Sequence, residues 1–348
     1  MIAERLTAQL LAGAPARDPV AVARRLLAVQ GQDARGARLA IRARSTGLTA
    51  ADVDRALGEQ RSLLVTWLNR GTLHMVCSED YAWLHALTTP PLVTANARRL
   101  AQEGVDPSAA ERGVRAIERS LADEGPLARG RLRERIATAG VPTEGQALVH
   151  LLMLATLRGL TVRGPVVGRE QAYVLVGDWL GKTPSVDRGR ALAELARRYL
   201  AGHGPAGERD LAKWSGLRLR DARAGLGAIA SELTRRADGL LDLAGRAPPA
   251  EQPPPRLLGP FDPLLLGWGS REEIVGANRS LVTVNGLFRP FALVRGRAAA
   301  TWRIAGGEVQ LEPFGRLARE DAAALRADAQ DVLRYLSMSS TSASVKPS

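Results

Sequence analysis

The order helix, helix, helix, strand pair recurs along the first two thirds of the chain, and this recurrence limits the possible folds more than any other feature. Apolar residues at helical spacing predict a helix over residues 20–29, and Thr49 with Asp52 predicts a capped start for another. Strand-like stretches follow at 63–68 and 72–76. This order is typical of a winged helix, a helix-turn-helix variant with a two-stranded wing.

Two further stretches show the same order, residues 110–180 and residues 187–243. In each, a turn with glycine or proline leads into a short helix and then a longer one, and a strand pair follows, the last around Asp238-Gly239. Similar helical trios occur in proteins that never bind DNA, so the pattern alone leaves both interpretations open. We predict an α+β fold of tandem winged-helix domains followed by a small C-terminal antiparallel β-domain.

The pattern changes at residues 247–255, where APPAEQPPP holds five prolines and predicts an extended spacer. Beyond it, strand-like runs flank two turn signals: Asn285-Gly286, with strands expected over 280–284 and 287–294, and Gly306-Gly307. A last helix is expected over Arg319–Leu336. The predicted domains are winged helices at 1–109, 110–186 and 187–246, a linker at 247–256, a β-rich domain with its final helix at 257–337, and a disordered tail at 338–348.

The chain is strongly basic, with 48 lysines and arginines against 36 acidic residues and a net charge of +12. Nearly all the cations are arginines, which bind phosphates in a bidentate manner, so the charge favours a nucleic-acid partner. A genome rich in G and C also prefers arginine codons, which is the alternative explanation of the arginine bias. The positive excess is spread along the whole chain, as a long DNA-binding surface requires.

The remaining composition bears on the compartment. A single cysteine, Cys77, excludes an internal disulfide framework and favours a reducing cytoplasm. The longest apolar run, residues 148–157, is interrupted by His150 and is far shorter than the roughly 20 residues of a membrane span. The start of the sequence lacks the pattern of a signal peptide. We therefore expect a cytoplasmic protein with no membrane partner.

Three stretches resemble one known family: AVQGQDARGA (28–37), RGTLHMVCSEDYAWL (70–84) and LLGPFDPLLLGWGSRE (257–272). Over essentially its full length the chain resembles the AlkZ-like winged-helix DNA glycosylases, a group that includes an azinomycin-resistance glycosylase and bacterial crosslink-repair relatives. The resemblance implies hydrolysis of the N-glycosidic bond of N-alkylated purines, including N7-guanine adducts and interstrand crosslinks. The family's Gln-x-Gln or Gln-x-Asp pair corresponds to Gln30 and Gln32. The middle residue, usually aliphatic, is Gly31 here.

Two amides suffice for this chemistry only with a substrate that is already charged. An amide is no general base near neutral pH, but alkylation at N7 makes guanine cationic and thus a good leaving group. The transition state then needs a positioned water and negative dipoles near the developing charge on the sugar, and two side-chain carbonyl oxygens supply both. We therefore predict Gln30 and Gln32 as catalytic residues, with no cofactor and no metal.

The two glutamines also impose a condition on the backbone. Residues two apart on an α-helix face nearly opposite ways, whereas in an extended chain they face the same side. We predict that Gln30 lies in the last turn of the first helix and Gln32 just beyond it, with Gly31 easing the stop. The alternative is that Gln-Gly-Gln is only a solvated helix end.

Other residues are candidates for DNA contact. Arg70, Thr72 and His74 alternate on an expected wing strand and are predicted either to contact DNA or, for His74, to stabilise the domain. The hairpin at Asn285-Gly286, with Phe288 and Arg289 near its tip, either enters the minor groove or is an ordinary sheet hairpin. Further predictions concern Asp262, expected to brace the fold rather than catalyse, and core tryptophans at positions 67, 83, 179 and 214.

The predicted function is that of a monomeric DNA glycosylase acting on double-stranded DNA with alkylated purines. The main alternative is a winged-helix transcriptional regulator that binds DNA without catalysis. A protein that confers resistance by binding a toxin is a third possibility.

Overall fold

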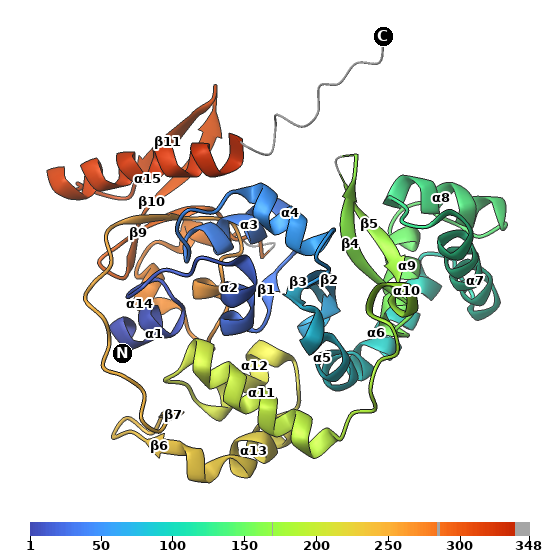
Figure 1. Ribbon diagram of the computed structural model, residues 1–348, viewed down its shortest axis with the longest axis horizontal. Helices are drawn as coiled ribbons and strands as arrows, with labels where there is room; N and C mark the ends of the chain where they lie inside the picture. The colour runs from blue at the N-terminus through green and yellow to red at the C-terminus, as the bar shows by residue number, and fades with distance from the viewer. Residues whose placement is uncertain (169, 284–285, 338–348) are drawn as a thin grey trace. The chain divides into compact units, whose positions relative to one another are not determined.

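The structure, a computed structural model, describes residues 1–168, 170–283 and 286–337. Helices and antiparallel sheets combine in two compact units (Figure 1). The first unit consists of residues 1–53, 192–214 and the described residues from 218 onward, and the second consists of residues 54–191 and 215–217. The α+β class predicted from the sequence is confirmed. The narrower domain boundaries remain a prediction.

The order of elements predicted for the three repeats is present. The first contains α2 (Pro19–Leu26), α3 (Ala34–Arg42), α4 (Ala50–Leu57), β2 (Leu63–Leu68) and β3 (Thr72–Cys77). The second contains α7 (Pro107–Glu124), α8 (Arg129–Thr138), α9 (Ala147–Leu157), β4 (Thr161–Val167) and β5 (Glu170–Leu175). The third contains α11 (Arg188–His203), α12 (Glu208–Ser215), α13 (Leu219–Ala228), β6 (Leu233–Arg235) and β7 (Leu241–Leu243).

Local capping explains where several of these helices begin. The Asp18 carboxylate accepts hydrogen bonds from the N–H groups of Val20 and Ala21, and Pro19 occupies the first helical position of α2. At α4 the predicted capping box is confirmed, since the Asp52 carboxylate accepts the Thr49 N–H at 2.7 Å. Helix α3 was not predicted as a separate helix, and α2 ends three residues earlier than predicted.

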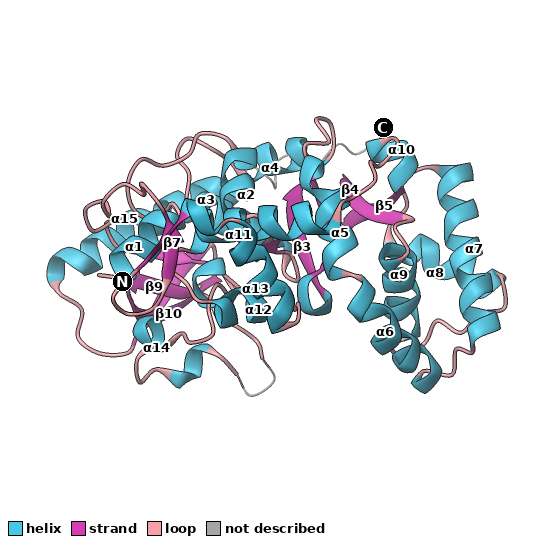
Figure 2. Cartoon of the chain, turned by 90° about the horizontal axis from the view of Figure 1, so that it is seen from below, coloured by secondary structure: helices cyan, strands magenta, loops and turns pink. Residues whose placement is uncertain are grey.

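The second unit is built on antiparallel strands in the order β3-β2-β4-β5. Further helices of this unit are α5 (Tyr81–Thr88), α6 (Pro90–Gln102) and α10 (Val176–Leu180). Helix α9 packs against α6, α7 and the strands β2 and β4, close to α8 (Figure 2). Nine of its eleven residues are buried: Ala147, Leu148, Leu151, Leu152, Met153, Leu154, Ala155, Thr156 and Leu157.

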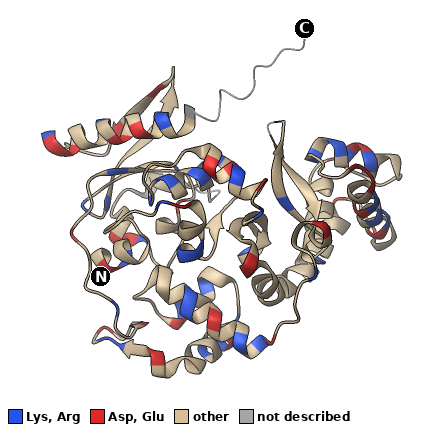
Figure 3. Ribbon diagram, in the orientation of Figure 1, with Lys and Arg blue, Asp and Glu red and all other residues tan. Residues whose placement is uncertain are grey.

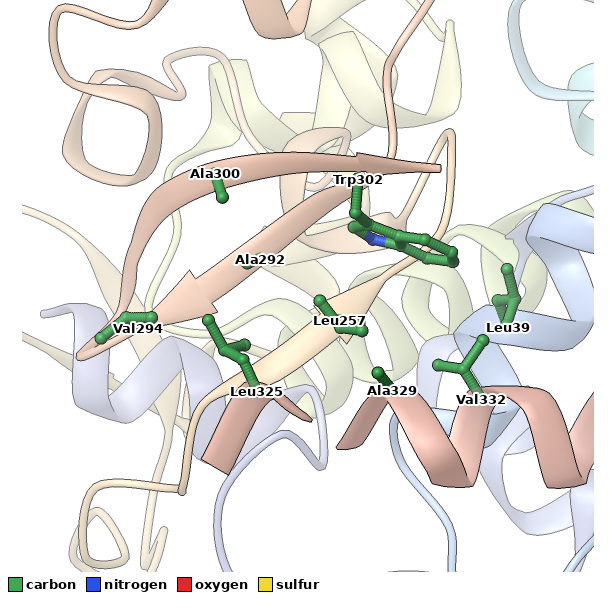
Figure 4. Close-up of a cluster of buried hydrophobic side chains, with 9 residues drawn as sticks. All are labelled: Leu39, Leu257, Ala292, Val294, Ala300, Trp302, Leu325, Ala329 and Val332. Atoms are coloured by element: carbon green, nitrogen blue, oxygen red, sulfur yellow. The ribbon is translucent and has the colours of Figure 1, made fainter. Parts of the chain in front are cut away.

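The C-terminal part of the first unit is a four-stranded antiparallel sheet in the order β11-β10-β9-β8. Its strands are β8 (Arg256–Leu258), β9 (Phe291–Val294), β10 (Arg297–Ala305) and β11 (Glu308–Pro313), and the last helix is α15 (Arg319–Ser337). Leu39 of α3 joins the core between this sheet and α15, beside Leu257 and Val332 (Figure 4). Helix α3 is therefore anchored in the C-terminal core although it lies more than 200 residues earlier in the sequence.

One of the two predicted hairpins is confirmed; of the strands predicted for the other, only the part from Phe291 to Val294 is a continuous strand among the described residues. Strands β10 and β11 meet at Gly306-Gly307, whose φ angles of 60° and 80° suit a tight two-residue turn. The other stretch begins with a 3-10 turn over Arg279–Leu281, followed, in the part that the structure describes, by an isolated bridge between Val282 and Phe288. Pro290 cannot donate to a ladder, and the continuous strand starts only at Phe291.

The first unit also contains α1 (Ile2–Ala8), β1 (Val29–Gln30) and α14 (Glu272–Val275). Short 3-10 turns occur in both units at Asn69–Gly71, Ser78–Asp80, Ala230–Glu232 and Pro263–Leu265. Among the helices of the described residues, none combines the length and the apolar character that a membrane span requires.

Candidate active site

The backbone turns sharply just before the two glutamines. Helix α2 ends at Leu26, and Leu27 has φ 65° and ψ −46° while the Ala28 N–H donates to the Leu26 carbonyl oxygen at 2.8 Å. This is a γ-turn of the uncommon, strained kind, and the buried Leu27 side chain holds it in place. The turn directs the chain into β1, the short strand that contains Gln30.

The predicted placement of the glutamines needs correction. Gln30 lies in β1 instead of the last helical turn, and Gln32 lies in the bend that follows. Gly31 does not end the helix, because α2 has already ended at Leu26 and the γ-turn at Leu27 follows it. Both glutamines lie outside any helix, which meets the backbone condition for serving one site. Gln30 is buried and Gln32 is exposed.

Helix α3 begins immediately after the glutamines and is fixed at its first turn. The Asp33 carboxylate accepts the Gly36 N–H at 2.6 Å and caps the helix. Gly36 lies directly against Pro260, because a Cβ on Gly36 would come within 2.6 Å of the Pro260 carbonyl oxygen. Only glycine permits this approach, so the segment around Pro260 determines where α3 starts.

The far end of α3 is held by a buried ion pair. Arg44 and Asp262 are both fully buried, and the guanidinium nitrogens lie 2.7 and 2.9 Å from the two carboxylate oxygens. The remaining Arg44 donors reach the carbonyl oxygens of Gln9 and Ala40 and the side chain of Gln9. Asp262 also accepts the Leu264 N–H at 2.9 Å. The predicted bracing role of Asp262 agrees with this network, in which every Arg44 donor has an acceptor.

A match to a family model decides what kind of chain carries this arrangement. The model described as "DNA glycosylase AlkZ-like" matches residues 23–335. The chain belongs to the AlkZ-like DNA glycosylase family. It is similar to an interstrand DNA cross-link repair glycosylase of Streptomyces sahachiroi, with 28% identity over 339 residues that cover 89% of this chain and 88% of that protein.

The fold agrees with this family. The solved structure of Streptomyces sahachiroi DNA glycosylase AlkZ is similar to this chain with a TM-score of 0.78 at 24% identity, covering 96% of this chain and 95% of that chain. In this AlkZ-like chain three residues that hold the segment of the two glutamines were not predicted from the sequence: Leu27, Gly36 and Arg44. Gly36 lies in the first of the three stretches that carry the family resemblance, and the Pro-Phe-Asp-Pro segment, which contacts Gly36 and Arg44, lies in the third; Leu27 and Arg44 lie in none of them.

The wing residues differ in how accessible they are in this AlkZ-like protein. Arg70 is exposed in a left-handed turn (φ 57°) between β2 and β3, so it does not alternate with the strand residues as predicted. Thr72 is half-buried, and its hydroxyl donates to the Asn69 carbonyl oxygen. His74 is buried, its Nδ1 is 3.0 Å from the Thr72 carbonyl oxygen, and burial lowers its pKa to about 3. We assign His74 to the stability of the second unit and leave it out of the DNA contacts.

Two buried histidines give a pH dependence of stability. His203 stacks on Tyr199, and burial lowers the pKa of His203, like that of His74, from 6.5 to about 3. The unfolded chain binds a proton near pH 6.5 and the folded chain only near pH 3, so stability is complete above pH 6.5 and is lost as the pH falls. The free energy of unfolding should drop by up to about 1.4 kcal/mol per pH unit per histidine. Urea unfolding at pH 7, 6 and 5 measures this.

A non-titrating variant separates the histidine effect from general acid sensitivity. His203→Phe keeps a ring in the stack and should remove the contribution of His203 to the slope in that interval, while the contribution of His74 remains. An unchanged slope in His203→Phe would contradict the assignment for His203.

The predicted C-terminal contacts lie on the surface of the first unit, except Asn285, which is outside the described residues. Gly286 and Arg289 are exposed. Phe288 is half-buried, with its ring centre 5.6 Å from that of Phe261. The Arg271 guanidinium lies 5.0 Å from the centre of the Phe288 ring. These side chains form an apolar surface with nearby positive charge.

Among the described residues, Cys77, Glu79 and Asp80 bring three potential ligand atoms within 4.8 Å of one another. One Asp80 oxygen accepts the Trp83 indole N–H, so we assign this group to the start of the helix that follows and propose no metal site. Two of the four predicted core tryptophans, at positions 67 and 214, are buried, whereas those at 83 and 179 are half-buried.

Proposed function

We propose that this chain hydrolyses the N-glycosidic bond of N-alkylated, cationic purines in double-stranded DNA, including bulky N7-guanine adducts and interstrand crosslinks. The observation that carries the proposal is the placement of Gln30 and Gln32 in a non-helical segment that α3 fixes from one side. The name of the Streptomyces sahachiroi relative, an interstrand DNA cross-link repair glycosylase, supports the crosslink substrate.

The amide oxygens act by position and dipole. Gln32, exposed to solvent, orients the water that attacks C1′ of the damaged nucleotide, and the buried Gln30 directs its carbonyl dipole toward the developing positive charge. The nearest carboxylate in sequence, Asp33, is engaged in capping α3, so we assign it no part in proton transfer. The leaving base carries its own charge, and no general acid, metal or cofactor is needed.

DNA contact is proposed for exposed and half-buried residues of both units. Arg70 and Thr72 would contact the duplex from the second unit, and Gly286, Phe288 and Arg289 from the first. Basic side chains occur on many elements of both units (Figure 3) and supply the favourable field for a polyanion. We propose that the protein acts as a monomer in the cytoplasm, associated with the nucleoid when bound to DNA.

Helix α9 weighs against the alternative of a transcriptional regulator. In the second repeat it is the third helix, which in a helix-turn-helix reader lies in the major groove. Here α6, α7 and the sheet cover it, and its buried residues are almost entirely apolar. No row of polar side chains on α9 is available to read base edges, so at least this repeat contacts DNA by another surface.

The proposed function is tested by comparing release of a cationic base with release of uncharged bases. A duplex with one N7-methylguanine should lose that base at least about 100-fold faster than it does spontaneously, since correct positioning of the attacking water and dipoles is worth this much. Matched duplexes with uracil or hypoxanthine should be left intact. Free base and abasic sites are measured by chromatography and alkaline cleavage, with and without EDTA, and an N7-linked crosslinked duplex tests unhooking. Sequence-specific footprints without base release would favour the regulator.

A further inference from the structure

Phe261 has an unusual backbone. Its φ of 56° lies in the left-handed region, which bulky side chains rarely adopt. Both neighbours are fixed: the Pro260 carbonyl oxygen lies against Gly36, and Asp262 is fully buried in its ion pair with Arg44. The strained conformation is thus imposed by the segment that braces the motif helix. Strain of this kind gathers at ligand-binding sites, where the surrounding structure maintains it.

The strain does not serve to bury the ring. Phe261 is only half-buried, and its ring lies beside that of the equally half-buried Phe288 in a tilted arrangement, with the planes at 46°. Arg271 lies over the Phe288 ring, and Leu287, 57% exposed, and the exposed Arg289 flank it. We call these five side chains the Phe261 patch. It combines aromatic faces and two guanidinium groups on the surface of the first unit.

We propose that the Phe261 patch binds a nucleobase that has left the stack of duplex DNA, with the base lying against the Phe261 ring. The inference rests on the proposed function and extends it to a base-binding site. Aromatic rings flanked by arginines are the usual platform for unstacked bases, because the ring faces take the base and the cations take the phosphates. The Arg271 guanidinium lies over the Phe288 ring and Arg289 is exposed, so both cations lie beside the aromatic faces of the patch.

The location of the patch supports this occupant. Phe261 follows Pro260, and Pro260 contacts Gly36 in the first turn of α3, four residues after Gln32. The contact between Pro260 and Gly36 therefore connects the segment of the Phe261 ring with the segment of the two glutamines. A base displaced during excision, either the damaged one or its partner, can stack there while the sugar remains at the glutamines.

Because of the backbone strain, a substitution at Phe261 can remove the ring without lowering the stability of the protein. Phe261→Gly removes the ring and also relieves the left-handed strain, so its melting temperature should be unchanged or higher. Leu10→Gly is a matched control, because Leu10 is also half-buried and apolar with φ 57° in the first unit. Phe261→Trp restores an aromatic face. If Phe261 served only packing, Phe261→Gly would lose DNA binding only as far as it loses stability. If the ring stacks on a base, DNA binding should weaken while the melting temperature is kept.

The readout is the fluorescence of 2-aminopurine placed opposite N7-methylguanine in a duplex. The wild type and Phe261→Trp should raise it on binding, as should Leu10→Gly, whereas Phe261→Gly should lose the rise and bind about 10-fold more weakly. A wild-type rise and affinity in Phe261→Gly would overturn the inference. Release of N7-methylguanine is measured separately. If the wild type releases no base, the proposed function is wrong, but the fluorescence still shows whether the Phe261 patch binds a base.

Discussion

Replacement of Asp262 by alanine is expected to lower the free energy of unfolding by about 3–5 kcal/mol, because it leaves the fully buried Arg44 guanidinium without its carboxylate. The unpaired charge would keep only the carbonyl oxygens and the Gln9 side chain as acceptors. Urea unfolding followed by circular dichroism measures the loss. The size of the effect reflects the cost of a buried unpaired charge more than the net value of the pair.

The double variant Arg44→Met with Asp262→Leu is the informative control. It removes both charges and fills similar volume, so most of the stability should return. The exposed pair of Glu208 and Arg223 is a second control, since Glu208→Ala should leave the unfolding midpoint almost unchanged. If Asp262→Ala unfolds at the same urea concentration as the wild type, the pair does not hold α3.

Replacement of Gln32 by alanine is expected to lower the single-turnover rate of N7-methylguanine release about 100- to 1,000-fold, the loss typical of one stabilising group at a transition state. Gln32 is exposed, so the melting temperature should not change. Gln30→Ala should lower the rate similarly and, since Gln30 is buried, also cost some stability. Duplex affinity, measured by fluorescence anisotropy, should stay within about twofold, because affinity comes mainly from phosphate contacts.

The exposed Gln310 on β11 serves as the control, and Gln310→Ala should keep the wild-type rate. If Gln32→Ala releases base at the wild-type rate, the exposed amide does not orient the water, even if the enzyme is a glycosylase. An equal loss of rate and of affinity would instead make the glutamines DNA-binding residues.

The parts of the fold that depend on neighbouring residues could be predicted from the sequence. Helix periodicity, the Thr49 and Asp52 cap and the Gly306-Gly307 turn all act within a few residues, and all are present. The predicted long strands on either side of position 285 were wrong, because the run of β-forming residues was read without the effect of Pro290 and of the turn at Arg279–Leu281. For the same reason α2 was predicted to continue past Leu26, since the apolar spacing continues although the backbone turns at Leu27.

The candidate site could be located by its two glutamines but not built from the sequence. The γ-turn at Leu27 depends on a buried side chain, and the Gly36 contact joins residues more than 200 positions apart. The burial of His74, which removes its charge near neutral pH, likewise depends on packing that alternation along β3 does not reveal. Nonlocal contacts of this kind leave no periodic signal in the chain.

The buried ion pair also sets an order of events during synthesis. Arg44 leaves the ribosome 218 residues before Asp262, an interval of about 10–40 s at ordinary translation rates. During that time the chain has its glutamines but lacks the partner that holds the following helix. A chain that ends before Asp262 thus leaves Arg44 without its carboxylate, and the end of the helix that follows the glutamines gains this partner only late in synthesis.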